Sequence, residues 1–220
     1  MSLRARRLLI TAGPTHEPID AVRYLANRSS GRLGLALAAA AREAGWDVTL
    51  LLGPVATAPP AGVTTQRFES TADLAARLEA CFPECDVLIM TAAVADYRPR
   101  PVARGKLPRE GAVVRLELEP TPDLVAACAA RKRPGQRLIG FALEEAAELE
   151  ARAVEKLRRK GLDAIVANPL ETMGAADIRA VVLTAAGERW MPGDGRSLDK
   201  AAFARWLIAW LGGWLGPADP

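Results

Sequence analysis

The chain has 220 residues, of which 50% are hydrophobic and 25% charged, proportions that fit one globular domain and exclude an intrinsically disordered protein. The formal net charge is only +3 and the basic residues are spread along the sequence, so no nucleic-acid partner is predicted. Cys81 and Cys85 have no second cysteine pair to complete a tetrahedral zinc site, so no structural metal is expected, and the odd number of cysteines suits a reducing compartment. The apolar run that begins at Leu8 ends at Thr11, too short for a membrane span or a secretory signal, so we expect a cytoplasmic protein without a membrane partner.

Short aliphatic runs alternate with helical runs along most of the chain, a pattern typical of βαβ units and a parallel sheet. The expected strands cover 8–11, 48–52, 63–68, 87–90, 138–141 and 164–167. The expected helices cover 33–44, 70–83, a segment starting at Asp123, 145–160 and 198–215. The sequence therefore predicts an α/β fold with a Rossmann-like, mostly parallel sheet flanked by helices, in a single domain over 1–220.

Three stretches add detail to this pattern. Residues 97–111 are rich in Pro, Arg and Gly, and apolar and charged residues alternate from 114 to 119. We interpret 103–119 as a hairpin-like arm, within a segment over about 97–119 that protrudes from the main sheet. The alternation at 114–119 predicts a strand with one face exposed to water. Segments 178–183 and 188–191 are expected to form a closing antiparallel pair. Aromatic and leucine side chains at spacings of three and four in the last helix predict a core or subunit contact.

Segment 27–34 is the strongest single indication of a ligand site. Ser29 and Ser30 are suited to cap the following helix, while Gly31 and Gly34 leave room for an anion beside the backbone. The free N–H groups and positive dipole end of that helix would bind phosphate. An ordinary serine-rich cap on a core helix is the alternative explanation.

Three further features are ambiguous when each is taken alone. Gly13 follows the first strand, where ligands of open α/β sheets bind, although its spacing is not that of a dinucleotide fingerprint. Asp96, after the fourth strand, could bind Mg²⁺ or a hydroxyl group, or form an Asx turn. Lys156 and Lys160 share a helix face and could bind a polyphosphate, or be solvated surface lysines.

Taken together, these segments resemble those of one family, phosphopantothenate–cysteine ligase. This is the phosphopantothenoylcysteine synthetase of coenzyme A biosynthesis, which in many bacteria is the C-terminal half of a bifunctional flavoprotein. The resemblance extends over about 8–183. The segments that carry it are Thr11–Asp20, Val22–Tyr24, Asn27–Gly31, Ala92–Tyr97, Gly140–Ala142 and Lys156–Asn168.

The resemblance implies a ligase that joins 4′-phosphopantothenate to L-cysteine through an acyl-nucleotide intermediate. The family uses Mg²⁺ and a nucleoside triphosphate, CTP in most bacteria and ATP in eukaryotes. Such chemistry needs positioned donors and cations rather than a histidine-activated nucleophile, which suits a chain whose only histidine is His16. No FMN is expected, because the match does not include the family's flavin-binding decarboxylase half, and a separate decarboxylase is an expected partner.

The resemblance also implies roles for individual residues. Asn27 matches the family's essential asparagine, which contacts the acyl intermediate, and is expected to be catalytic together with Lys106. Asp96 is expected to lie near the metal. The expected substrate-binding residues are Asn27, Ala92, Ala93 and Asp96, and the expected nucleotide-binding residues are Gly13, Ser29, Gly31, Gly34, Ala92, Asp96, Phe141, Lys156 and Lys160.

Lys106 belongs to a segment that departs from the family's pattern. Relatives have a lysine-rich K-x-K-K whose first lysine closes over the active site, often from the other subunit, which implies a homodimer. Here the segment reads Lys106-Leu107-Pro108-Arg109, so one cation is lost and the proline stiffens the arm. The resemblance implies CTP as the nucleotide. Departures at 143–145 and 169 lie on the base-binding side, so ATP is the alternative.

Two other functions are compatible with parts of the sequence. A Rossmann-type reductase needs a glycine fingerprint and a Tyr-x-x-x-Lys pair, but neither Tyr24 nor Tyr97 has a lysine four residues later. A non-catalytic nucleotide-binding relative or regulatory subunit would explain the altered arm. Asn27, Asp96 and Lys106 are retained, which favours a working ligase.

Overall fold

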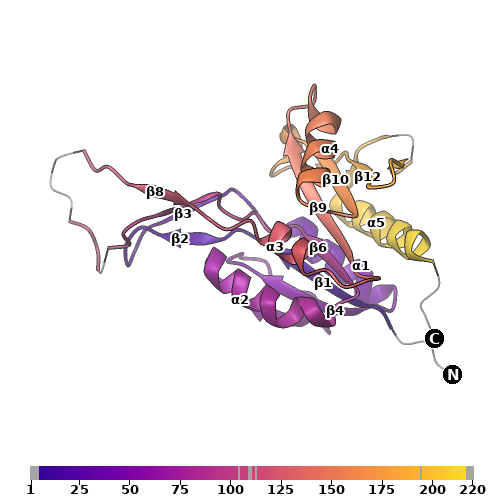
Figure 1. The fold of residues 1–220 in the computed structure, drawn as a ribbon, viewed down its shortest axis with the longest axis horizontal. Helices are drawn as coiled ribbons and strands as arrows, with labels where there is room; N and C mark the ends of the chain where they lie inside the picture. The colour runs from indigo at the N-terminus through magenta and orange to yellow at the C-terminus, as the bar shows by residue number, and fades with distance from the viewer. Residues whose placement is uncertain (1–4, 104, 109–110, 112, 194, 217–220) are drawn as a thin grey trace.

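The computed structural model describes residues 5–103, 105–108, 111, 113–193 and 195–216. At its centre lies an eight-stranded sheet in the order β13-β12-β10-β9-β6-β1-β4-β5. Helices lie on both faces of this sheet, and a long arm projects from one end of the molecule (Figure 1). The prediction of a Rossmann-like, mostly parallel sheet flanked by helices is therefore confirmed.

The parallel part of the sheet places its switch point between β1 and β6. In spatial order, its strands are the third, second, first, fourth, fifth and sixth along the chain, as in doubly wound nucleotide-binding folds. Ligands of such sheets bind beyond the carboxyl ends of the strands at the switch point. The six strands are β1 (Arg7–Ala12), β4 (Asp47–Leu52), β5 (Thr64–Arg67), β6 (Val87–Met90), β9 (Arg137–Glu144) and β10 (Ala164–Pro169).

Each face of the sheet has its own apolar core. The helices α1 (Arg32–Glu43) and α5 (Lys200–Leu215) pack on one face, and α2 (Thr71–Cys81), α3 (Leu124–Ala130) and α4 (Leu149–Arg159) on the other. In α5, Phe203, Leu207 and Leu211 are fully buried and the tryptophans pack against the same cluster, which confirms the predicted core face. Within the described ranges, no helix is long and apolar enough to cross a membrane.

Several element boundaries differ from those expected. The helix expected over 145–160 begins only at Leu149, because β9 continues to Glu144, which pairs with Pro169 of β10. The expected strand 178–183 is two strands, β11 (Asp177–Ile178) and β12 (Val181–Thr184). The first pairs with β14 (Leu198–Asp199), and the second lies antiparallel to β10 and to β13 (Arg189–Trp190).

The arm consists of two antiparallel pairs, of which the sequence predicted one. β7 (Tyr97–Pro99) pairs with β8 (Leu118–Pro120), as the expected hairpin-like segment requires, and β2 (His16–Pro18) pairs with β3 (Tyr24–Ala26). The expectation of only one wet face is wrong. Val114, Leu116 and Leu118 are 65%, 45% and 46% exposed, because no element of the described chain covers them.

Candidate active site

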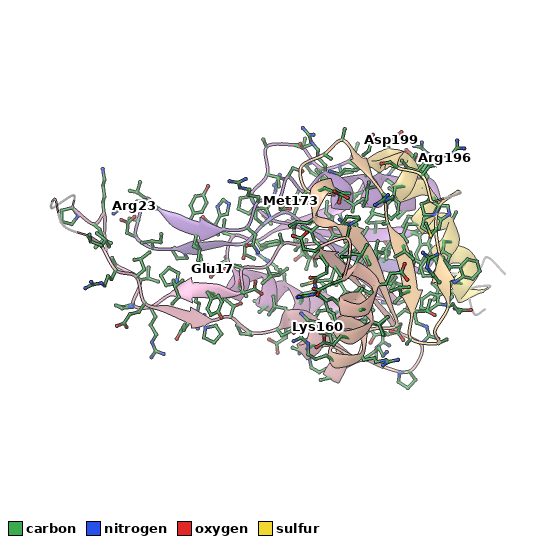
Figure 2. All side chains as sticks on the ribbon, turned by 90° about the horizontal axis from the view of Figure 1, so that it is seen from above. Glu17, Arg23, Lys160, Met173, Arg196 and Asp199 are labelled. Carbon is green, nitrogen blue, oxygen red and sulfur yellow. The ribbon has the colours of Figure 1, made fainter. Side chains whose placement is uncertain are left out.

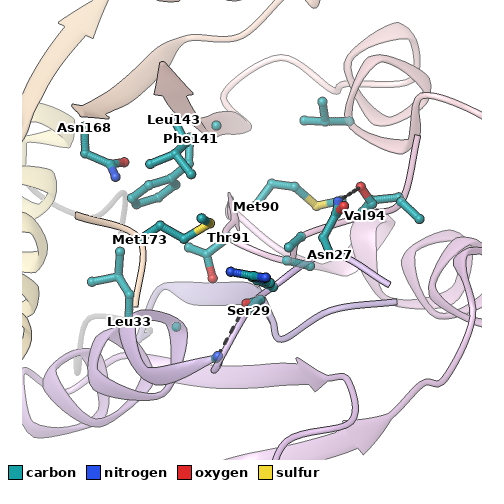
Figure 3. A pocket seen from close by; sticks show the side chains of 18 of the residues that line it. Asn27, Ser29, Leu33, Met90, Thr91, Val94, Phe141, Leu143, Asn168 and Met173 are labelled. Carbon is teal, nitrogen blue, oxygen red and sulfur yellow. Dashed lines mark hydrogen bonds between the residues drawn. The ribbon is translucent and has the colours of Figure 1, made fainter. Parts of the chain in front are cut away.

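A cleft of about 1290 Å³ opens beyond the carboxyl ends of the central parallel strands. Its walls come from 26–34, 90–96, 121–125, the ends of β9 and β10, and α4 (Figure 3). Gly13 and Lys106, also expected at the site, are not among its lining residues. The expected residues that do line it are Asn27, Ser29, Gly31, Gly34, Ala92, Ala93, Asp96, Phe141, Lys156 and Lys160.

The N-terminus of α1 is open to this cleft. Its N-cap is Gly31, in the left-handed region at φ 68°, and no side chain caps the helix. The expectation that Ser29 or Ser30 caps it is wrong, because the positive-φ turn at Gly31 places both serines before the helix. Ser29 Oγ instead accepts a bond from the Gly31 N–H at 3.4 Å. The N–H groups of the first turn therefore remain available to an anion.

Close packing explains two of the glycines. A Cβ on Gly34 would lie 2.4 Å from Ala12 Cβ and 2.6 Å from Thr91 Oγ1, so only glycine lets α1 approach the ends of β1 and β6. Gly13 has φ 85° and is buried against Val55, whose Cγ1 would lie 3.1 Å from an added Cβ. Gly13 is thus closely packed beside Gly31, which lines the cleft.

Asn27 joins the root of the arm to the loop after β6. Its Nδ2 donates to the carbonyl oxygen of Val94 at 2.9 Å (Figure 3). This bond uses one of two amide protons, and the Oδ1 atom accepts no bond from any residue in the described ranges. One N–H and the amide oxygen of Asn27 are therefore available to a ligand.

Two buried threonines support the same loop from behind. Thr11 Oγ1 accepts a bond from the Ala92 N–H at 3.1 Å, and Thr15 Oγ1 accepts one from the Ala95 N–H at 3.0 Å. These hydroxyl groups satisfy main-chain donors that the end of β6 leaves unpaired. Neither threonine was expected from the sequence to be a site residue.

Glu17 extends this support to α2. Its carboxylate, at 3% residue exposure, accepts bonds from the Thr71 N–H at 2.8 Å and the Thr71 hydroxyl at 2.6 Å. Thr71 Oγ1 lies 3.3 Å from Thr15 Oγ1. Glu17 lies near the root of the arm in Figure 2. A buried network therefore links the arm, the start of α2 and the loop that carries Asp96. In the sequence, only the acidic character of Glu17 within a short, mostly uncharged segment indicated this network.

Asp96 is exposed and lines the cleft. The described residues contain no group of three or more His, Cys, Asp or Glu side chains that could hold a metal. Mg²⁺, however, is commonly held by one or two carboxylates together with substrate phosphates. The site therefore fits a cation carried on a polyphosphate rather than one enclosed by protein.

The two lysines of α4 have different surroundings. Lys156 Nζ donates to the carbonyl oxygen of Phe141 at 2.9 Å, and burial followed by the nearby charge of Lys160 lowers the pKa of Lys156. Lys160 Nζ forms an ion pair with Asp123 Oδ2 at 2.9 Å. Both line the cleft, so α4 adds positive charge to the wall formed by the end of β9.

Lys106 is exposed on the arm, and its segment is tied to the neighbouring hairpin. The buried Asp20 carboxylate accepts bonds from the N–H groups of Arg23 at 2.8 Å and Leu107 at 3.0 Å. The bonded Arg23 guanidinium holds the pKa of Asp20 well below its usual range. Arg23 lies out along the arm in Figure 2. Arg109, which the sequence analysis noted beside Lys106, lies outside the described residues.

Comparisons with known proteins agree with this fold. The family model for the C-terminal domain of DNA/pantothenate metabolism flavoproteins matches residues 3–212. The Mycobacterium bovis coenzyme A biosynthesis bifunctional protein CoaBC is 42% identical over 218 residues, covering 94% of this chain and 47% of the relative. A cysteine/cysteine sulfinic acid decarboxylase of an unidentified prokaryote is 44% identical over 174 residues, covering 79% of this chain and 48% of the relative.

Among solved structures, a crystal structure of the C-terminal domain of a coenzyme A biosynthesis bifunctional protein CoaBC has a TM-score of 0.78 and 37% identity. The match covers 95% of both chains. The fold and the cleft thus define a Rossmann-like α/β protein with a cleft at the carboxyl ends of its parallel strands. The chain belongs to the family of the C-terminal domain of DNA/pantothenate metabolism flavoproteins. It spans about half the length of the curated relatives described above.

Proposed function

We propose that the chain is the ligase that joins 4′-phosphopantothenate to L-cysteine, with the cleft as its active site. The observation that carries this proposal is the uncapped N-terminus of α1, which lines the same cleft as Asn27 and Asp96. A helix N-terminus that can bind phosphate lies at the same cleft as the Asn27 amide, which is held by its bond to Val94. This arrangement suits a reaction in which a nucleotide phosphate activates a carboxylate. The coenzyme A biosynthesis names of relatives support the same reaction.

The proposed reaction has two steps. A carboxylate oxygen of phosphopantothenate attacks the α-phosphorus of the nucleotide, and pyrophosphate leaves. The amine of cysteine then attacks the acyl carbon, loses a proton, and the bond to the nucleoside monophosphate breaks. The second Nδ2 proton of Asn27 would donate to the negative charge that develops on the acyl oxygen. Mg²⁺ held at Asp96 would neutralise phosphate charge.

The nucleotide is proposed to lie between α1 and α4. Ser29 and Gly31 would bind its phosphates with the first turn of α1, and Lys156 and Lys160 would approach them from the opposite wall. Phe141, half-buried at the end of β9, offers an apolar ring to the base. We propose CTP as the co-substrate, with ATP as the alternative.

A homodimer is proposed from the arm. Lys106 does not line the cleft of its own chain, and we propose that it reaches the cleft of a second copy. The arm also exposes more apolar surface than a monomer usually leaves in water. Its exposed apolar side chains are Val22, Tyr24, Leu25, Tyr97, Val102, Val113, Val114, Leu116 and Leu118. A decarboxylase that acts on the product is proposed as a further partner.

The proposed function is tested by following pyrophosphate. The purified chain is incubated with phosphopantothenate, cysteine, Mg²⁺ and each nucleoside triphosphate in turn. We expect pyrophosphate release that depends on phosphopantothenate, and cysteine-dependent release of the monophosphate. A non-catalytic relative would bind nucleotide without either release, and that outcome would reject the proposal.

Asn27→Asp tests the role of the amide. The variant loses both N–H donors and carries a charge that repels the acyl oxygen, so we expect one pyrophosphate per site but at least about 100-fold slower amide formation. Gln66→Glu, the same change on β5 at the far edge of the sheet, is the matched control and should turn over normally. Normal turnover by Asn27→Asp would show that its amide has no part in the second step.

A further inference from the structure

We infer that Asn168 selects the base of the nucleotide and favours those with an exocyclic amine at C4 of a pyrimidine or C6 of a purine. Cytosine and adenine have this amine, whereas uracil and guanine have a carbonyl oxygen at the same position. The inference rests on the proposed function, because it assumes that the cleft binds a nucleotide. It assigns a recognition role to a residue that the sequence analysis left without one.

Asn168 lies at the apolar end of the cleft. It pairs in parallel register with Leu143 of β9, and Phe141 lies two residues earlier on that strand. Because side chains two residues apart share one face of a sheet, these three side chains lie together. Met173 lies near them, while Asn27 and Val94 occupy the other side of the cleft (Figure 3). A flat base fits this end, and the phosphates fit the end of α1.

The hydrogen bonds of Thr172 determine which way the Asn168 amide points. Thr172 Oγ1 donates its only proton to the carbonyl oxygen of Pro169 at 2.7 Å. The same oxygen lies 2.7 Å from the Asn168 amide, so it can only accept, and Nδ2 must be the donor. The Oδ1 atom is therefore the part of the amide left for a ligand, and it accepts no bond from residues in the described ranges.

An acceptor held in this way discriminates between bases. An exocyclic amine can donate to Oδ1, whereas a carbonyl oxygen placed there would face a second oxygen with no proton between them. A site built to accept a hydrogen bond rejects an analogue that lacks the donor, because its polar group is left unpaired. We expect discrimination of about 10- to 100-fold from this one contact.

The first experiment uses the unmodified protein. Specificity constants for pyrophosphate release are measured with CTP, ATP, UTP and GTP, and with a CTP analogue that has hydrogen in place of the exocyclic amine. We expect CTP or ATP to exceed UTP and GTP by at least about tenfold, and the analogue to lose most of the advantage of CTP. The comparison of CTP with ATP shows which amino base fits.

Two variants test the mechanism of selection. Asn168→Leu removes the acceptor, so activity with CTP or ATP should fall by about 10- to 100-fold while activity with UTP changes little. Thr172→Val removes the hydroxyl that holds Nδ2, so the amide can turn and donate to a carbonyl, and we expect UTP to gain. Thr65→Val is the matched control, because its hydroxyl also donates to a carbonyl but lies on β5.

The outcomes separate this inference from the proposed function. Equal use of CTP and UTP, or an unchanged preference in Asn168→Leu, would overturn the inference and leave the ligase intact. If no nucleotide yields pyrophosphate, the ligase proposal fails, and base selection is then decided by calorimetric binding of the same five nucleotides to the unmodified protein. Equal affinities in that measurement would overturn the inference as well. Thermal unfolding of each variant identifies losses that come from misfolding.

Discussion

Thr11 and Thr15 hold the loop that carries Asp96, although neither residue lines the cleft. The reason is that a loop leaving a buried strand has main-chain N–H groups that need acceptors. Unlike Thr11, Thr15 also connects this loop to α2 and to the arm. Its hydroxyl lies 3.3 Å from that of Thr71, which is bonded to Glu17. At the scale of single residues, the site is thus supported by hydroxyl groups one layer below the ligand.

Replacing Thr15 tests this support. Thr15→Val keeps the shape of the side chain but leaves the Ala95 N–H without an acceptor, which should cost about 1–3 kcal/mol of unfolding free energy. Because the loop shifts, we also expect kcat to fall more than KM rises. Thr15→Ser keeps the hydroxyl and should restore both. Urea unfolding and steady-state pyrophosphate kinetics provide the measurements, and equal behaviour of the two variants would argue against a positioning role.

At the scale of elements, α4 presents a buried cation to the cleft. Lys156 has a pKa lowered from 10.5, first by burial and then by Lys160, so its charged form opposes folding below the lowered pKa. That opposition is relieved as pH rises from the lowered pKa towards 10.5. A bound polyphosphate reverses the effect, because its negative charge favours the protonated amine.

A pH dependence of nucleotide binding follows for α4. As the pH rises through the lowered pKa of Lys156, the amine loses its proton and its attraction for phosphate, so KM for the nucleotide should increase on the alkaline side. Lys156→Arg keeps its charge at every accessible pH and should give a flatter profile. The measurement is KM between about pH 7 and pH 9.5 for both proteins. Parallel profiles would indicate that Lys156 does not contact the phosphates.

At the scale of the whole molecule, the arm carries apolar side chains that no other part of the described chain covers. Its apolar side chains point to water, and Asp20 ties the two hairpins together near Lys106. Such an element is expected to be stable when a second copy covers it.

The oligomeric state tests this expectation. Light scattering should give twice the chain mass for the unmodified protein. Val114→Glu combined with Leu116→Glu should give a monomer of unchanged circular dichroism, because both side chains are already exposed and contribute little to the fold. Trp190→Glu, at an exposed position on β13, should remain dimeric. A monomeric unmodified protein would remove the basis for a role of Lys106 in a second cleft.

The alternation of strands and helices and the segments that form the cleft could be predicted from the amino-acid sequence. Those features depend on local periodicity, on glycine and proline positions, and on short segments that resemble a known family. The expected boundaries were wrong where pairing extends a strand, as at Glu144, and where a two-residue strand ending at Ile178 belongs to a separate small sheet.

Contacts between distant residues come from the tertiary structure. The bond from Ala95 to Thr15 and the register of Leu143 with Asn168 both join segments far apart in the chain. Local patterns do not contain such contacts, since each depends on how the strands of the sheet are ordered and aligned.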